Sequence, residues 1–312
     1  MPHHPKIVVV GSANTDLTLQ LPHLPTVGES VIGTQFNRAM GGKGANQAVA
    51  AVRMGAEVTF ICRLGRDDFG RASYQAYQQE GLNTEYIAWD DQAPTGVALI
   101  FINSTGENML GIVSGANMNL SGADIGRAER AIAAADLVLM QLEVPVSTDL
   151  KAAEIAGRHG VPVVLNPAPA VRFPLELLER IRYFTPNETE LDLTLKELAN
   201  QHGSPETALD WLKSRVPNLI VTLGAQGCRV ISGEKDDAYP AFAVKAVDTT
   251  AAGDAFNGAL AVSLARGLAL PEAVRYASAA GAITTTRYGA MSSSPTQAEV
   301  EEFLQNPPPL RS

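Results

Sequence analysis

The sequence predicts an α/β fold with a doubly wound, mostly parallel central sheet, helices on both of its faces, and a small antiparallel sheet beside it. Short β-branched runs alternate with stretches of helical period, which is typical of βαβ units. Several runs are apolar on both faces, as strands between two helix layers are. Two further segments have a two-residue period instead. We expect one domain over residues 1–312.

The elements of the central sheet follow from these runs. The expected strands cover residues 6–10, 58–62, 137–141, 161–165, 219–223 and 229–231. The expected helices cover residues 45–54, 127–135, 148–158, 205–215, 255–266 and 271–286. Such alternation implies right-handed βαβ units and a doubly wound sheet. In sheets of this kind, ligands bind beyond the carboxyl ends of the strands.

The small sheet is expected from residues 14–40 and 94–114. Leu17, Leu19 and Leu21 alternate with polar residues in the first segment, and the second alternates in the same way. A sheet of this size is barely stable alone in water. It therefore needs cover from the main domain or from a second subunit.

Composition and charge exclude several classes of protein. The chain is 46% hydrophobic and 18% charged, which is ordinary for a globular protein. Its net charge of -9 argues against nucleic acid or an anionic membrane as main partner. The chain has only two cysteines, too few for a disulfide framework. It has no apolar run long enough to span a membrane, and its apolar start is too short for a signal peptide. We therefore expect a cytoplasmic protein.

The richest candidate stretch is residues 247–256, where small residues immediately precede a helical pattern. The backbone N–H groups of Ala251, Ala252 and Gly253 should point out of the helix N-terminus and form an anion site. Asp254 follows in the first turn. An isolated Asp there is most often a simple helix-terminal charge, but its surroundings favour a functional carboxylate.

A second stretch, residues 40–48, places three glycines around Lys43 at the start of a helix. Glycine lets the backbone approach a ligand closely. Gly44 stands where a P-loop requires Ser or Thr, so this is no P-loop. Asn46 should project from the first turn beside Lys43.

Two further stretches each allow two interpretations. Asn187 and Glu190 are spaced as a helix capping box, or they lie near a metal-bound nucleotide phosphate, with Glu190 acting on Mg²⁺ through water. The segment 222–227 is a plain hairpin, or its glycines contact a nucleotide.

Other residues fall at the expected ligand edge, and some motifs are missing. Asn14, Asp16 and Glu143 follow predicted strands. The sequence has no GxGxxG after its first strand and no HExxH, CxxC or GxSxG, which argues against dinucleotide dehydrogenases, zinc enzymes and nucleophilic hydrolases.

Taken together, GGKGANQA at 41–48, VLNPAPA at 164–170, TPNETE at 185–190 and VDTTAAGDAFNGAL at 247–260 closely resemble the PfkB carbohydrate-kinase family. The resemblance extends from residues 11–16 to 286–295. It implies a ribokinase-like fold whose small sheet is a β-lid, commonly paired with its twin in a homodimer. It also implies ATP-dependent phosphorylation of D-ribose at O5, with Mg²⁺ required and K⁺ activating.

The resemblance assigns roles by position. It implies that Asp254 is the general base and that Ala251, Ala252 and Gly253 form the anion hole. The positions that match sugar contacts are Asn14, Asp16, Gly42, Lys43, Asn46, Glu143 and Asp254. Those that match the nucleotide side are Asn187, Glu190, Thr222, Gly224, Gly227, Gly253 and Ser278. Those that match a K⁺ site are Asp248, Thr250, Thr284, Arg287, Gly289 and Ser293.

Alternatives remain at this point. Ser278 stands where family members often carry His or Asn near the adenine, so the nucleotide preference stays open. A kinase for 2-deoxyribose, a ketohexose or a nucleoside has the same motifs. A sugar or nucleotide sensor on this scaffold is a different class, and it would not need Asp254.

Overall fold

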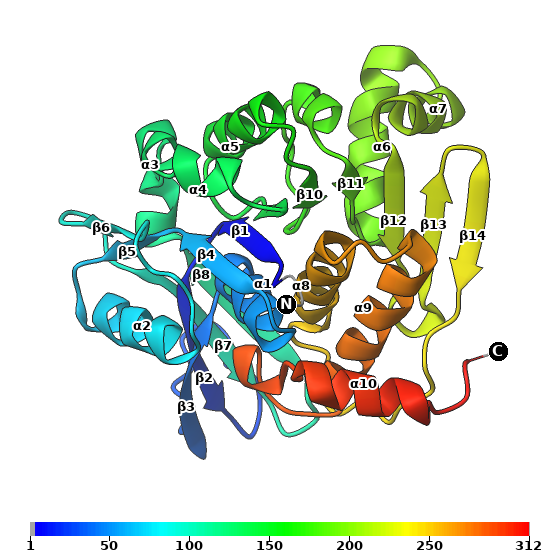
Figure 1. The fold of residues 1–312 in the computed structure, drawn as a ribbon. Coiled ribbons are helices and arrows are strands. Elements are labelled where there is room, and N and C mark those ends of the chain that lie inside the picture. Colours follow the sequence, from blue (N-terminus) through cyan, green and yellow to red (C-terminus); the bar gives the residue numbers. More distant parts are fainter. Residues whose placement is uncertain (1–3, 312) are drawn as a thin grey trace.

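The computed structural model describes residues 4–311, so the predicted limits at residues 1 and 312 lie outside the described residues. Its large sheet has eight strands in the order β14-β13-β12-β11-β10-β9-β1-β4 (Figure 1). Neighbours from β4 to β12 run parallel, and β13 and β14 are antiparallel at one edge. The predicted mostly parallel sheet is confirmed. Its strands are β1 (Lys6–Val10), β4 (Glu57–Ile61), β9 (Leu137–Gln141), β10 (Val163–Asn166), β11 (Tyr183–Phe184), β12 (Asn218–Thr222), β13 (Cys228–Ser232) and β14 (Lys235–Tyr239).

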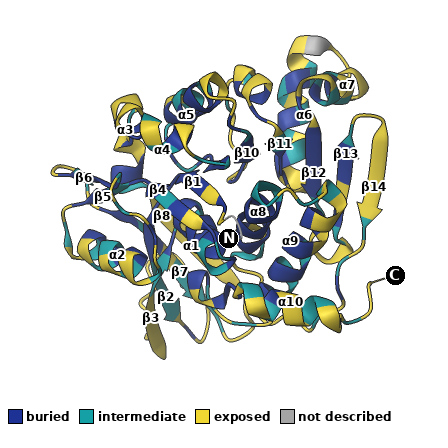
Figure 2. Ribbon diagram, viewed as in Figure 1, coloured by how far each residue is buried: buried dark blue, intermediate teal, exposed yellow. Residues whose placement is uncertain are grey.

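Helices cover both faces of this sheet. Ile7 and Val9 belong to one apolar core, and Val8 and Val10 belong to the other, because successive side chains of a strand point to opposite faces. The first core is completed by α1 (Lys43–Arg53), α2 (Asp68–Gln79), α8 (Ala252–Ala265), α9 (Leu270–Thr285) and α10 (Gln297–Gln305). The second is completed by α3 (Gly122–Arg127), α4 (Glu129–Ala133), α5 (Val146–Arg158), α6 (Glu188–His202) and α7 (Pro205–Arg215). The buried residues accordingly lie along the sheet and the inner helix faces (Figure 2).

The small sheet consists of β2 (Asn14–Gln20), β3 (Gln35–Gly41), β7 (Gly96–Ile102) and β8 (Asn108–Val113), in the order β3-β2-β7-β8. It projects from the body of the molecule beside α2 (Figure 1). Pairing is antiparallel within each hairpin, as expected, whereas β2 and β7 pair in parallel. The first residues of the two strands, Asn14 and Gly96, pair with each other where the small sheet joins the body, so both strands run outward in the same direction.

Several elements differ from the sequence prediction. The expected helix 127–135 is shortened to α4, and α3, which was not expected, precedes it; the two meet at Ala128, where φ is -90° and ψ is 4°. Helices α2 and α10 and strand β14 were not expected. Strand β14 has the sequence KDDAY and is mostly exposed, so it lacks the apolar signal of a buried strand. Within residues 4–311, no helix combines the length and hydropathy that a membrane crossing needs.

Candidate active site

Asp254 lies in the first turn of α8, close to the carboxyl ends of the central strands. Its Oδ2 accepts a hydrogen bond from Asn46 Nδ2, and its Oδ1 accepts one from Gln47 Nε2, each at 3.0 Å. The residue is 7% exposed. The two amide donors come from α1, so the packing of α1 on α8 places the carboxylate.

Glycines at the start of α1 allow this approach. Gly42 caps the helix with φ of 89°, a conformation that other residues rarely adopt. A Cβ on Gly44 would lie 2.5 Å from the backbone nitrogen of Ser12. The GGKG stretch therefore lets the helix begin directly against the segment after β1, with Lys43 as its first residue.

Three carboxylates surround Lys43. Although burial lowers the pKa of its ammonium group, the charges of Asp254, Glu143 and Glu190 raise it above the ordinary value. Lys43 is therefore a permanent positive charge at physiological pH. It sits among the groups that the sequence analysis assigned to the sugar, the base and the metal.

Burial also changes the acidity of the carboxyls. It raises the pKa of Asp254, which Lys43 and the two α1 amides oppose. It raises the pKa of Asp16 to about 6, with the charges of Glu143 and Asp254 adding to the effect. A carboxylate of raised pKa is a better proton acceptor at neutral pH.

The other predicted sugar residues are held by partners that sequence analysis missed. Glu143 Oε2 accepts from Ser12 Oγ at 2.5 Å and from the backbone nitrogen of Lys43 at 3.0 Å. Asn14 Oδ1 accepts from Asn117 Nδ2 at 2.7 Å. Ser12 directly follows Gly11, at the start of the stretch 11–16 in which the family resemblance begins, but no local pattern pointed to Asn117, which is 103 residues from Asn14.

Gln47 is also a residue that sequence analysis missed. It is fully buried and donates to both Asp254 and Asn166. One signal existed: Gln47 is a polar residue on the buried side of an otherwise alanine- and valine-rich helix. Such a residue needs a buried partner.

A cavity of about 430 Å³ lies at the α8 N-terminus, where Ala252, Gly253 and Phe256 line it. Part of its wall is apolar and includes Phe242, Val244 and Phe256. Six of the seven residues predicted for the nucleotide line it: Asn187, Thr222, Gly224, Gly227, Gly253 and Ser278. Asp254 does not line the cavity, but its neighbour Gly253 does.

The seventh residue, Glu190, forms the capping box with Asn187. Its carboxylate accepts from the backbone nitrogen of Asn187 at 2.9 Å and from Asn187 Nδ2 at 3.0 Å. Asn187 Oδ1 in turn accepts from the Glu190 backbone nitrogen. The capping interpretation is therefore confirmed, and Asn187 still faces the cavity. The segment 222–227 likewise does both things: it is a hairpin between β12 and β13, and it lines the cavity.

The predicted anion site is the N-terminus of α8. Ala251 has φ of 58°, and no side chain caps the helix. The Ala252 nitrogen donates to the Thr249 oxygen at a long 3.3 Å. The first N–H groups of a helix have no partner inside it, so amides here are available to an anion beside the cavity.

Three of the residues predicted for K⁺, Asp248, Thr250 and Gly289, come together from two segments. Asp248 accepts from the backbone nitrogens of Thr250 and Gly289, each at 2.9 Å. Burial raises the pKa of Asp248, but these hydrogen bonds outweigh it and hold the pKa below its usual value. The Arg287 nitrogen donates to the Thr284 oxygen, and Ser293 Oγ donates to the Ala290 oxygen.

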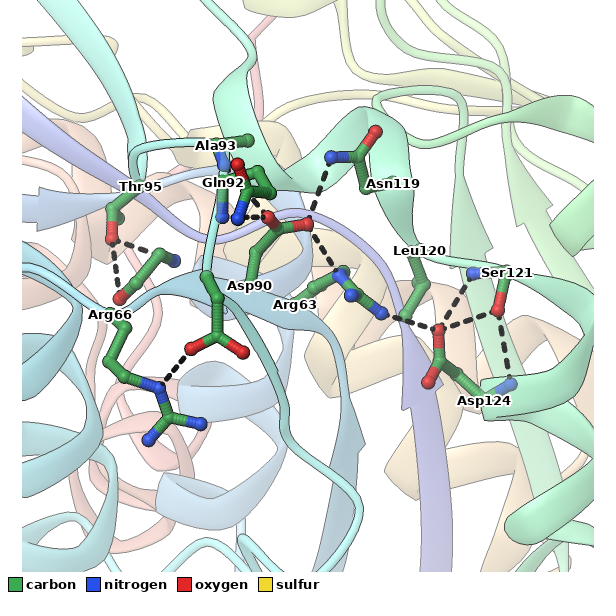
Figure 3. Close-up of polar contacts among 12 residues, drawn as sticks. Arg63, Arg66, Asp90, Gln92, Ala93, Thr95, Asn119, Leu120, Ser121 and Asp124 are labelled. Carbon is green, nitrogen blue, oxygen red and sulfur yellow. Dashed lines mark hydrogen bonds and ion pairs between the residues drawn. The ribbon is translucent and has the colours of Figure 1, made fainter.

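A cluster of charged and polar groups joins the base of the small sheet to the body (Figure 3). Asp90 ends β6 (Ala88–Asp90), which pairs with β5 (Arg63–Gly65). Its carboxylate accepts from Arg63 Nε at 2.8 Å, from Asn119 Nδ2 at 2.9 Å and from the backbone nitrogens of Gln92 and Ala93. Arg63 also contacts Asp124 at 3.1 Å. The chain entering β7 and the chain leaving β8 are thus tied to one carboxylate.

The chain is similar to known proteins along most of its length. Residues 4–297 match the model of the pfkB family carbohydrate kinases. The chain is 42% identical to the ribokinase of Haemophilus influenzae over 96% of its own length and 98% of that protein. It is 35% identical to the deoxyribokinase of Salmonella typhi over 96% and 98%. The structure of Arabidopsis thaliana ribokinase complexed with ribose and ATP matches with a TM-score of 0.86 and 33% identity, covering 97% of this chain and 99% of that one.

Proposed function

Because this chain belongs to the pfkB family of carbohydrate kinases, we propose that it transfers the terminal phosphoryl group of ATP to O5 of D-ribose, giving D-ribose 5-phosphate. One observation carries the proposal. The Asp254 carboxylate, held by Asn46 and Gln47, lies one residue from Gly253, which lines the 430 Å³ cavity. A proton acceptor and a phosphate site therefore share one helix N-terminus.

Asp254 acts as the general base in this proposal. It takes the proton of the sugar's 5-hydroxyl as the oxygen attacks the phosphoryl group. Phosphoryl transfer has a loose transition state, so most of the catalysis comes from positioning and charge neutralisation. A weak base such as a carboxylate is therefore sufficient. The amides of Ala251, Ala252 and Gly253 stabilise the charge on the transferring group.

The sugar lies among the polar groups beside Asp254. Carboxylates, amides and one ammonium suit a ligand made of hydroxyls, each of which donates and accepts a hydrogen bond. Asp16 and Glu143 accept from sugar hydroxyls, Lys43 donates, and Asn46 has a buried Oδ1 with no partner among the described residues. The proposed sugar contacts are Asn14, Asp16, Gly42, Lys43, Asn46 and Glu143.

ATP occupies the cavity, with the adenine toward Ser278 and the phosphates toward Asn187 and Gly253. Transfer from ATP requires a divalent metal, which we propose to be Mg²⁺. Glu190 fits a water-mediated role: both oxygens already accept one hydrogen bond each, and each keeps further acceptor capacity. When bound, the metal neutralises phosphate charge.

We further propose that K⁺ binds between the segments containing Asp248 and Gly289. The candidate ligands are oxygens of Asp248, Thr250, Thr284, Arg287, Gly289 and Ser293. Hard oxygen ligands suit such a cation. Bound there, it would stiffen the turn that leads into Ala251 without touching the sugar.

The small sheet is proposed to act as a lid over the sugar and to pair with its twin in a homodimer. By strand register Phe36, Leu99 and Met109 lie on one face of this sheet and Leu110 and Ile112 on the other, and all five are between 44% and 66% exposed. Exposed apolar residues gathered on one element usually mark an interaction surface. This pairing would supply the cover that so small a sheet requires.

A second substrate, 2-deoxy-D-ribose, is favoured by the similarity to a deoxyribokinase. The test is a comparison of kcat/KM for D-ribose, 2-deoxy-D-ribose, D-fructose and adenosine with ATP, with the product identified by phosphorus NMR. We expect D-ribose to have the highest value. A higher value for any other acceptor overturns the substrate assignment.

A further inference from the structure

Four buried polar side chains connect the carboxylate of Asp254 to the backbone of the residue before it. They are Gln47, Asn166, Thr185 and Asn257, and their exposed fractions lie between 0% and 7%. They come from four separate parts of the fold: α1, the end of β10, the segment after β11 and α8. Asp254 and Gly253, at the two ends of this connection, are the residues proposed for proton transfer and phosphate binding.

The first half of the connection runs from the carboxylate to the central sheet. Gln47 Nε2 donates to Asp254 Oδ1 and to Asn166 Oδ1, each at 3.0 Å. Asn166 Nδ2 then donates to the backbone oxygen of Thr185 at 2.9 Å. Both hydrogens of the Gln47 amide are therefore used.

The second half returns to the start of α8. Thr185 Oγ1 donates to Asn257 Oδ1 at 2.6 Å. Asn257 Nδ2 donates to the backbone oxygen of Gly253 at 2.9 Å. The connection closes on the peptide group that joins Gly253 to Asp254, so the Gly253 carbonyl and the Asp254 side chain are both held by it.

The direction of every hydrogen bond in this ring is determined. Gln141 Nε2 donates to Gln47 Oε1 at 2.7 Å, so Gln47 must present its NH₂ group to Asp254 and Asn166. A flipped amide would set an oxygen against the carboxylate. The backbone oxygens of Thr185 and Gly253 accept only, which fixes Asn166 and Asn257 in the same way.

We propose that Gln47, Asn166, Thr185 and Asn257 are positioning residues that hold the Asp254 carboxylate and the Gly253 peptide in one fixed relation. The proposal rests on the function proposed above, in which these two groups act on the same phosphoryl transfer. Misplacing a reacting group by about 1 Å can lower a rate by on the order of 100-fold. None of these four side chains has a buried polar atom without a partner, whereas Gln141 Oε1 has no partner among the described residues. Satisfied buried side chains of this kind keep such groups rigid.

This role also explains why four separated motifs carry polar residues that face the interior. Gln47 lies in GGKGANQA, Asn166 in VLNPAPA, Thr185 in TPNETE and Asn257 in VDTTAAGDAFNGAL. The sugar and nucleotide assignments do not use these four side chains. Their hydrogen bonds join the motifs to one another.

The decisive test is the pair Thr185→Val and Thr185→Ser, assayed with the acceptor that the wild-type protein phosphorylates fastest. Valine keeps the shape and loses the hydroxyl that donates to Asn257, whereas serine keeps the hydroxyl. We expect Thr185→Val to lower kcat by about tenfold, the equivalent of one lost hydrogen bond. The KM values for sugar and ATP should change less than about twofold, and Thr185→Ser should restore most of kcat.

Ser232→Ala is the matched control. Ser232 Oγ donates to Asn218 Oδ1 at 2.8 Å, and Asn218 Nδ2 donates to the Arg182 oxygen at 3.1 Å. This is the same arrangement at the opposite end of the strands. The control should lower the unfolding temperature as Thr185→Val does and leave kcat unchanged. Equal kcat in Thr185→Val and wild type, or equal losses in Thr185→Val and the control, would overturn the proposal.

A second variant covers the case in which Thr185→Val does not fold. Gln47→Met removes the donor to Asp254 Oδ1 while keeping an unbranched side chain of similar length. When kcat is measured against pH, its fall at low pH reports protonation of Asp254. In Gln47→Met this fall should move to higher pH, because the Asp254 carboxylate loses a hydrogen bond that favours its charged form. A fall that stays at the same pH counts against the network. If the wild type phosphorylates no sugar, the proposed function fails instead, and that assay needs no variant.

Discussion

Gly258 of α8 packs directly against Ala50 of α1. A Cβ on Gly258 would lie 2.6 Å from the Ala50 Cβ and 2.9 Å from the Gln47 oxygen. This close crossing of two helices brings Asn46 and Gln47 within hydrogen-bonding distance of Asp254. The geometry at the carboxylate thus depends on a glycine one turn further along α8.

Gly258→Ala should therefore push α1 and α8 apart. Overpacking of this kind costs about 1–3 kcal/mol, and the two amide donors would move away from the carboxylate. We expect a lower unfolding temperature together with a fall in kcat of about tenfold or more. The control is Gly126→Ala on α3, where a Cβ would meet open space; its unfolding temperature and kcat should stay near wild type. Gly267→Ala is unsuitable, because the φ of Gly267 is 80° and alanine would be strained there.

Asp254→Asn tests the proposed base. The amide cannot accept the proton of the sugar hydroxyl, so turnover should fall by on the order of 10² to 10⁴. ATP binding, measured by calorimetry, should stay nearly unchanged because Asp254 does not line the cavity. The control is Asp192→Asn, an exposed carboxylate paired with Lys196 on α6. Wild-type turnover in Asp254→Asn would remove the base assignment.

Sugar binding should depend on pH through Asp16. Burial and two neighbouring carboxylates raise its pKa to about 6, so Asp16 is mostly protonated at pH 5 and mostly ionised at pH 7. The ionised form accepts more hydrogen bonds from hydroxyls. Calorimetric titration with D-ribose should show affinity rising from pH 5 to pH 7 and then levelling. In Asp16→Asn this rise should be lost, and a rise that persists would point to another group.

Asp16 also affects stability, but its contribution to the free energy of unfolding falls with rising pH, whereas sugar affinity rises. Its pKa in the folded protein lies above the 3.8 of an unperturbed aspartate, so the folded state binds the proton more tightly than the unfolded chain. The free energy of unfolding should therefore fall as the pH rises from about 4 to about 6, and this group adds no further change above that. The difference in denaturant midpoint between wild type and Asp16→Asn, followed across this range, measures the contribution.

Asp90→Ala tests the anchoring of the small sheet. The hydrogen bonds that Asp90 accepts, above all the one from the Ala93 nitrogen, hold the pKa of its carboxyl well below the usual range. Replacing Asp90 by alanine takes this partner away from Arg63, which is partly buried (Figure 3). Arg63 keeps Asp124 as a partner, so we expect a loss of about 2 kcal/mol in unfolding free energy, the cost of hydrogen bonds lost from a charged group. Hydrogen exchange in β7 and β8 should become faster, and the KM for sugar should rise more than the KM for ATP.

Asp91→Ala provides the neighbouring control. Asp91 pairs with Arg66, but both side chains are more than half exposed. Exposed pairs contribute little, typically under 1 kcal/mol. Exchange rates in β7 and β8 that are the same in both variants would show that Asp90 does not anchor the small sheet.

Replacing Na⁺ by K⁺ at equal concentration should raise the activity. The reason is the oxygen-rich junction at which Asp248 holds the Thr250 and Gly289 backbones. Initial rates in the two chlorides, for wild type and for Asp248→Ala, measure the effect. The variant should be slower and should respond equally to both salts. A wild type that is indifferent to the cation would leave this junction with a purely structural role.

The sequence by itself determined the local elements and the identity of the chemical groups. Strands β1 and β9 and helix α7 have the predicted limits, because their apolar runs or caps are local signals. The capping box of Asn187 and Glu190 is also local, since its two residues are three apart. The motifs likewise indicated Asp254, Lys43 and six residues that line the cavity, but not its apolar wall of Phe242, Val244 and Phe256.

Only the tertiary structure decided how these groups meet. Gln47 contacts Asp254 across 207 residues, and Asn14 contacts Asn117 across 103. The parallel pairing of β2 with β7 and the exposed edge strand β14 have no periodic signature either. Helical and strand periods describe which face of an element is buried, but they do not say which buried polar groups become partners. That choice is made by packing between elements, above all by the close crossing of α1 and α8.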